Sequence, residues 1–304
     1  MNARKRHLQQ DLEHLEEQFR EANEEINRRS GRPLIPAIIT GLVLGGVAIT
    51  GFFFPIVFAI FVMAMVGGAS WELATAVRSS GRRVPRVPTV IASVAVVGVA
   101  YFFGVEWMWL AFLASAVVLA VWRIVELAVP RLRAGAGQVG ADILGSIFVL
   151  TYVPFLASFA VLLFVEDRWW VLAFLIVVVL IDTGAYAVGL TLGRHPMAPR
   201  ISPKKSWEGF GGGAVVALGS GIGVALLLMG QPWWIGIIFG LLMLFTATFG
   251  DLAESLIKRD LGIKDMSGLL PGHGGILDRL DGILLSAPVA YGLFLVLRHL
   301  GFIA

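Results

Sequence analysis

The 304-residue chain is 57% hydrophobic and only 15% charged, which excludes an ordinary water-soluble domain, because one globular core cannot hide that much apolar surface. Its net charge of +3 is small for this length, so no nucleic-acid partner is expected. The absence of cysteine excludes disulfides, thiolate metal sites and cysteine nucleophiles. The 36 glycines are typical of transmembrane helices, where glycine lets neighbouring backbones approach closely.

Residues 1–33 form a charged N-terminal extension that does not resemble a signal peptide. Apolar residues recur in it at alternating spacings of four and three, which predicts an amphipathic helix. These residues are Leu8, Leu12, Leu15, Phe19, Ala22 and Ile26. Such a helix would either dimerise or lie on the membrane surface, and the alternative is a solvated tail.

From Leu34 onward, nine apolar segments have about the length needed to cross a bilayer. They cover residues 34–51, 53–77, 88–105, 107–129, 141–165, 169–192, 209–230, 233–254 and 282–302. We therefore predict an all-α polytopic membrane protein of about nine transmembrane helices. The N-terminal helices occupy residues 34–165, and a second, C-terminal group of transmembrane helices occupies residues 166–304.

The positions of the basic residues predict the topology. If the N-terminus is cytoplasmic, all 24 lysines and arginines except Arg168 and Arg298 fall on the inside. This asymmetry follows the positive-inside rule, and nine spans then place the C-terminus outside. Tryptophan pairs fall in the predicted outer turns, where indole rings favour the headgroup level. They are Trp107 with Trp109, Trp169 with Trp170, and Trp233 with Trp234.

Polar residues at membrane depth are costly, and therefore indicate candidate functional positions. Asp182 follows an unbroken apolar run in the sixth segment, where it is either a functional carboxylate or a helix-end carboxylate in water. The inside loop 200–209 offers two lysines and two hydroxyls that suit a phosphate-rich ligand. These residues are Ser202, Lys204, Lys205 and Ser206. Alternatively, the lysines only determine topology or contact lipid headgroups.

The third candidate stretch runs from residue 250 to residue 282. Four polar side chains would share one helix face at spacings of three and four. They are Asp251, Glu254, Ser255 and Lys258. Asp278 and Asp281 are three apart at the predicted start of the last helix. Converging carboxylates are hard oxygen ligands of the kind that Mg²⁺ prefers, often shared with substrate phosphates, so the pattern predicts a site for a metal-bound polyphosphate.

This stretch closely resembles the signature of the phosphatidate cytidylyltransferase family, the CDP-diacylglycerol synthases. The matching residues are Ser255, Lys258, Arg259, Lys264, Asp265, Pro271, His273, Gly274, Gly275, Asp278, Arg279, Leu280 and Asp281. The resemblance extends upstream to Asp182 and to the Ser-Pro-Lys-Lys loop. Relatives usually have threonine where Ser206 stands and often a basic residue where Leu190 stands.

The resemblance implies that a phosphate oxygen of phosphatidic acid attacks the α-phosphorus of CTP and that pyrophosphate leaves. We expect Asp251, Asp278 and Asp281 to bind Mg²⁺, with the number of metal ions left open. Residues 166–304 would then form the catalytic region, in which the other candidate residues contact the two substrates. Lys258, Arg259 and Lys264 would neutralise phosphate charge, Ser255 would donate to a phosphate, and Lys204, Lys205, Ser202, Ser206, Arg279 and Asp182 would line the substrate site. His273 would act on a proton, bind phosphate or fix the Gly274–Gly275 turn.

Two other classes of function remain open. A polyprenol or phytol kinase would transfer the terminal phosphoryl group of CTP, and a transporter would place polar groups near the membrane midplane. For the expected enzyme we predict a homodimer in the inner membrane, with the site facing the cytoplasm and open to membrane lipids.

Overall fold

The computed structural model describes residues 34–270 and 274–303, and this part of the chain is almost entirely helical. The long helices are α2 (Leu34–Phe53), α3 (Pro55–Ser79), α4 (Arg86–Phe103), α5 (Val105–Val125), α6 (Ala136–Leu150), α7 (Leu156–Glu166), α8 (Arg168–Leu192), α9 (Trp207–Leu227), α10 (Trp233–Asp260) and α11 (Asp281–His299). The short elements are the 3₁₀ turns η1 (Glu126–Ala128), η2 (Pro130–Leu132) and η4 (Leu277–Arg279), the π-helical turn η3 (Thr151–Phe155), and the strands β1 (Pro196–Ala198) and β2 (Ser202–Ser206). The amphipathic helix predicted within residues 1–33 lies outside the described residues.

Eight helical stretches among the described residues are long and apolar enough to cross a membrane. One of them, Ala136–Glu166, runs continuously through α6, η3 and α7. Pro154 lies in η3, where its missing N–H and its ring favour a local departure from α-helical geometry. Helix α2 adds a shorter apolar stretch, Ile38–Phe53. These helices coincide with the nine predicted segments to within a few residues, and the all-α polytopic prediction is confirmed.

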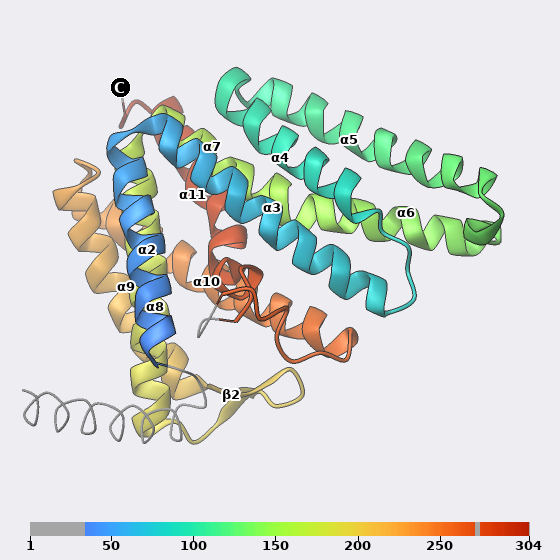
Figure 1. The fold of residues 1–304 in the computed structure, drawn as a ribbon. Helices are drawn as coiled ribbons and strands as arrows, with labels where there is room; N and C mark the ends of the chain where they lie inside the picture. The colour runs from blue at the N-terminus through green and yellow to red at the C-terminus, as the bar shows by residue number, and fades with distance from the viewer. Residues whose placement is uncertain (1–33, 271–273, 304) are drawn as a thin grey trace, which may run out of the picture.

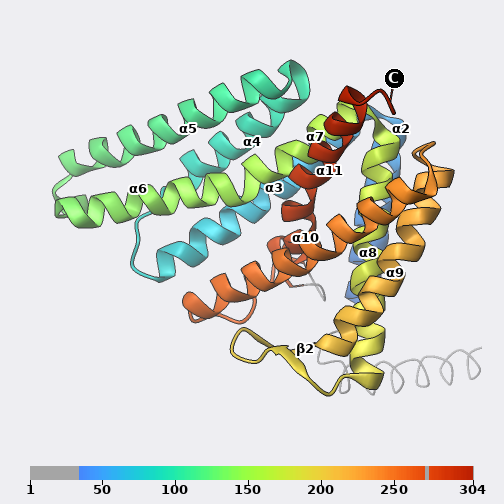
Figure 2. The same ribbon diagram turned by 180° about the vertical axis from the view of Figure 1, so that it is seen from behind.

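The helices form two groups with α10 and α11 between them (Figures 1 and 2). Helices α4, α5 and α6 extend to one side, and α8 and α9 stand on the other. Glycine allows the close approach of α9 and α10, because a Cβ added to Gly221 would lie only 3.0 Å from the Cα of Gly240. Small residues at such contacts are a general feature of membrane helix packing.

The interior of the bundle contains one tryptophan that was predicted to lie at the membrane interface. Trp170 is only 1% exposed and makes edge-to-face contacts with Phe239 and Phe294, at ring-centroid distances of 6.0 and 5.3 Å. Its neighbour Trp169 is 42% exposed. Consecutive side chains on a helix point about 100° apart, so one indole faces the bundle and the other faces out.

A short antiparallel hairpin replaces the loop that was expected between α8 and α9. In it Pro196 pairs with Ser206, and Ala198 pairs with Ser202. Figure 1 shows the hairpin at the end of the molecule where α2 begins, whereas α11 ends at the opposite end. The hairpin thus lies at the same end as the last turns of α10, which contain the predicted site residues.

Candidate functional site

The last turns of α10 present the polar face that the sequence predicts. The hydroxyl of Ser255 lies 3.4 Å from Asp251 Oδ1, and Lys258 Nζ donates to Glu254 Oε2 at 3.0 Å. Each pair is four residues apart, as helical geometry requires for neighbouring side chains. Glu254 is fully buried, so a carboxyl group enters the protein interior at this point.

Lys258 connects α10 to the turn η4. Its ammonium group also donates to Asp278 Oδ1 at 3.0 Å. The second oxygen of Asp278 accepts the N–H groups of Gly275 at 2.8 Å and Met266 at 3.3 Å. Burial alone would raise the pKa of Asp278, but interactions with Glu254, Lys258 and the Gly275 N–H outweigh it and lower the pKa below its ordinary value. As an ionised carboxylate, Asp278 therefore holds Lys258 and the neighbouring backbone N–H groups together.

The two aspartates predicted to open the last helix occupy different elements, because Asp278 lies in η4 and α11 begins at Asp281. Helix α10 comes very close to the first turn of α11. A Cβ on Gly250 would lie 3.1 Å from the carbonyl carbon of Asp281 and 3.2 Å from the Cα of Gly282. Only glycine permits this approach, and it brings the adjacent Asp251 close enough to Asp281 for the two carboxylates to interact electrostatically.

The hairpin contacts α10 through two side chains. Lys205 of β2 forms an ion pair with Asp251, and both side chains are about one quarter to one third exposed. Arg259 Nε donates to the carbonyl oxygen of Ile201 at 3.2 Å. Lys204, the other lysine of the loop, is exposed. The structure therefore brings one of the two predicted lysines into direct contact with a predicted metal ligand.

Other predicted residues lie at the margin of this cluster. The hydroxyl of Ser206 accepts the N–H of Gly209 at 3.1 Å and so caps the N-terminus of α9. Ser202 begins β2 and is partly buried, and Lys264 is exposed. His273 lies outside the described residues.

Asp182 joins the cluster from α8. Its exposed carboxylate interacts electrostatically with Asp251 and Asp281, and with the cations Lys205 and Arg279. The bundle thus gathers charged groups from α8, β2, α10, η4 and α11, although they are widely separated in the sequence.

Glu72 of α3 is a residue that the sequence analysis did not single out. It is only 2% exposed, and its carboxylate accepts the N–H groups of Ile276 and Leu277, each at 2.9 Å, and the hydroxyl of Ser267. A signal for it was present, since Glu72 is an isolated acid within an apolar span, where ionisable groups usually have a specific role.

A second buried ionic group lies away from the site. Arg123 and Asp142 are both fully buried and pair at 2.8 Å, and Asp142 also accepts from Gln138 at 2.8 Å and from the N–H of Arg83 at 2.8 Å. These contacts join α5 and α6 to the connection between α3 and α4. We assign this group to fold stability, because its charges face one another and not the cluster.

The cluster offers hard oxygen atoms to a cation. Among residues 34–270 and 274–303, no three carboxylates or histidines already converge as a preformed metal site. Magnesium, however, needs only one or two protein carboxylates when substrate phosphates complete its shell. Asp251 and Asp281 meet that requirement, and Oδ1 of Asp278 keeps a lone pair beyond its bond to Lys258. Glu254 adds a buried carboxyl group nearby, whose Oε2 accepts from Lys258 and whose Oε1 has no hydrogen-bond partner among the described residues.

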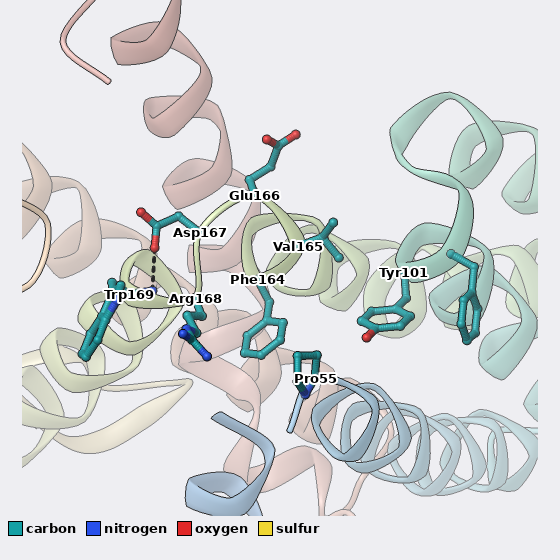
Figure 3. A pocket seen from close by; sticks show the side chains of 9 residues that line it. Pro55, Tyr101, Phe164, Val165, Glu166, Asp167, Arg168 and Trp169 are labelled. Atoms are coloured by element: carbon teal, nitrogen blue, oxygen red, sulfur yellow. Dashed lines mark hydrogen bonds between the residues drawn. The ribbon is translucent and has the colours of Figure 1, made fainter. Parts of the chain in front are cut away.

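A cavity of about 530 Å³ lies elsewhere in the molecule, at the junction of α7 and α8 (Figure 3). Its lining includes the ends of α4 and α7 and the start of α3 and α8. The lining residues are Pro55, Tyr101, Phe102, Phe164, Val165, Glu166, Asp167, Arg168 and Trp169. None of the predicted site residues lines this cavity, so it is separate from the charged cluster.

The fold and the charged cluster together define a multi-pass helical membrane protein with carboxylates and basic side chains gathered at one end of its bundle. The chain belongs to the cytidylyltransferase family, whose sequence model matches residues 35–297. It is 41% identical to a phosphatidate cytidylyltransferase of Mycobacterium bovis over 271 residues, which is 86% of this chain and 89% of the relative.

Two further relatives carry the same name. The phosphatidate cytidylyltransferase of Mycobacterium leprae is 39% identical over 280 residues, covering 88% of this chain and 90% of the relative. That of Brucella suis is 46% identical over 110 residues, covering 36% of this chain and 41% of the relative. The similarity to the mycobacterial proteins therefore includes the N-terminal helices, for which the sequence analysis found only generic membrane character.

Proposed function

We propose that the protein is a phosphatidate cytidylyltransferase, which transfers the cytidylyl group of CTP to phosphatidic acid and forms CDP-diacylglycerol and pyrophosphate. The observation that carries this proposal is the meeting of Lys205, Asp251, Lys258, Asp278 and Asp281 at one end of the bundle. Relatives with this name align over most of the chain. A lipid substrate also explains why the site lies at the ends of membrane helices.

The reaction needs charge neutralisation more than a covalent nucleophile. A phosphate oxygen of phosphatidic acid bonds to the α-phosphorus of CTP, and the bond from that phosphorus to the bridging oxygen of the β-phosphate breaks. Lys205 and Lys258 now pair with carboxylates, and both can shift toward incoming phosphate oxygens. Arg259 and Arg279 are exposed at the same site and can contact substrate phosphates. Preorganised positive groups at the developing charge are a major source of catalysis.

We further propose that Asp251, Asp281 and Asp278 hold Mg²⁺ together with the phosphates of CTP. The donor set supports this proposal, because all three aspartates supply the hard carboxylate oxygens that Mg²⁺ prefers. When bound, the metal ion would neutralise charge on the triphosphate and on the departing pyrophosphate.

The proposed location is the inner membrane, with the site facing the cytoplasm. The distribution of lysine and arginine supports this orientation, since the charged cluster and most basic residues lie on the predicted inner side. Phosphatidic acid would enter sideways from the inner leaflet, where its acyl chains remain among membrane lipids.

A single assay distinguishes cytidylyl transfer from phosphoryl transfer. Purified protein in lipid nanodiscs is incubated with Mg²⁺, phosphatidic acid and CTP labelled on the α-phosphorus. We expect the label in CDP-diacylglycerol, with release of one pyrophosphate per product. Release of labelled CDP together with a phosphorylated lipid would instead identify a lipid kinase, and transport of CTP without turnover would identify a transporter.

We also propose a homodimer, supported by the apolar stripe that the sequence places in residues 1–33. The mass of the detergent-solubilised protein, measured by light scattering with and without residues 1–30, tests both the dimer and the stripe. An unchanged dimer after the deletion would exclude a contribution of the stripe.

A further inference from the structure

The buried carboxylate of Glu72 connects the N-terminal helices to the segment between α10 and α11. Its two oxygens accept the N–H groups of Ile276 and Leu277 at 2.9 Å each, and Oε1 also accepts the hydroxyl of Ser267. A carboxylate that is only 2% exposed needs such donors, since an unpaired buried charge is very unfavourable. The donors come from one segment and not from the helices that surround Glu72.

These contacts hold that segment at two places. Ser267 lies near its beginning, and Ile276 and Leu277 lie near its end. Between them Leu270 and Gly274 exchange backbone hydrogen bonds of 2.9 and 3.1 Å. Glu72 therefore links the first and the second half of the connection between α10 and α11 to helix α3.

The absence of a side chain at Gly275 lets Glu72 and Asp278 both approach the same stretch of backbone. A Cβ on Gly275 would lie 2.9 Å from Glu72 Oε2 and 3.0 Å from Asp278 Oδ2. The N–H of Gly275 donates to Asp278, and the next two N–H groups donate to Glu72. The position of Asp278 is consequently set by a backbone that Glu72 holds, and Asp278 in turn holds Lys258 at 3.0 Å.

We propose that Glu72 is a positioning residue for the reaction, acting through residues 275–278 on Asp278 and Lys258. The expected loss of turnover rests on the proposed function. The conclusion that Glu72 holds residues 275–278 in place rests on the contacts alone. Because Glu72 is only 2% exposed and its oxygens already accept these donors, we assign it no direct contact with the substrates. A small displacement of reacting groups can cost about 100-fold in rate, so loss of the three contacts would lower turnover more than binding.

The test uses Glu72→Gln, which keeps the size of the side chain but turns an amide NH₂ toward backbone donors. We expect kcat to fall about 10- to 100-fold while the KM for CTP changes less than about threefold. Glu72→Asp keeps the charge and should recover part of the lost kcat. Glu106→Gln, at an exposed position in the first turn of α5, is the matched control and should leave kcat unchanged.

Hydrogen exchange of residues 274–278 provides a readout that does not depend on turnover. Exchange there should become faster in Glu72→Gln and stay unchanged in Glu106→Gln. Ser267→Ala removes one of the three contacts and should produce a smaller change in the same direction, which keeps the test valid if Glu72→Gln folds poorly.

The outcomes separate this inference from the proposed function. If Glu72→Gln only lowers the melting temperature, while kcat per folded molecule and exchange of residues 274–278 stay normal, Glu72 is structural and the inference is wrong. If the wild-type protein makes no CDP-diacylglycerol, the proposed function fails, and the exchange data still decide whether Glu72 holds residues 274–278.

Discussion

Lys205 of the β-hairpin and Asp251 of α10 form an ion pair that closes the hairpin onto the charged cluster. Both side chains remain partly exposed and are therefore accessible to the proposed phosphates and cation. The pair links two segments that the sequence analysis could only place on the same side of the membrane.

Replacing Asp251 with asparagine tests the proposed metal ligand. We expect activity at limiting Mg²⁺ to fall by about two orders of magnitude or more, because a hard-cation ligand loses its charge. Lys205→Met should also lower activity, and the double variant should lose less than the product of the two single losses, because the residues interact directly. If the activity of the double variant, measured by initial rates, falls by the full product of the two single losses, the ion pair is unrelated to turnover.

Asp278→Asn should reduce activity as strongly, with an additional structural effect. Asp278 accepts hydrogen bonds from Lys258, Met266 and Gly275, and an amide in its place cannot accept all of them. Hydrogen exchange of residues 266–270 and 274–278 should therefore become faster than in Asp251→Asn. Asp265→Asn, at an exposed position in the same connection, is the comparison and should be milder. Near-normal turnover of well-folded Asp278→Asn would contradict the assigned role.

The lowered pKa of Asp278 predicts a specific pH dependence of stability. A carboxyl group whose pKa is lower in the folded protein contributes stability above its unfolded pKa of about 3.9, and this contribution is lost as the pH falls through the folded value. The difference in melting temperature between the wild type and Asp278→Asn should be constant from about pH 8 to pH 5 and shrink below about pH 4. A difference that already shrinks near pH 6 would mean that the pKa is raised.

Gly250→Ala tests the close approach of α10 to the first turn of α11. The added methyl group would meet the backbone of Asp281 and Gly282, and overpacking of this kind costs about 1–3 kcal/mol. We expect a lower melting temperature and at least about a tenfold loss of activity, since Asp251 and Asp281 would move apart. Gly292→Ala in α11 is the control, because the added Cβ would meet no atom within 4 Å beyond the local backbone of its own helix. Equal behaviour of the two variants would show that the contact at Gly250 is dispensable.

The positive-inside pattern predicts opposite sides for the two ends of the chain, with the N-terminus in the cytoplasm and the C-terminus outside. Reporter fusions that are active only in the cytoplasm or only outside it can measure this. A C-terminal fusion active only in the cytoplasm would show that the number of spans is even.

Features that depend on local order along the chain could be predicted from the sequence. The apolar runs determine the spans, because each must satisfy its backbone hydrogen bonds within a helix when it crosses lipid. The spacing of Asp251, Ser255 and Lys258 determines their common face, because helical periodicity is local.

Features that depend on which helices meet were decided only by the tertiary structure. The sequence could not indicate that Trp170 faces the interior, that Asp278 is held by backbone N–H groups in η4, or that Glu72 reaches the connection between α10 and α11. Periodicity shows which residues share a face, but the partner of that face follows from packing of the whole bundle, where glycines such as Gly250 set how closely two helices approach.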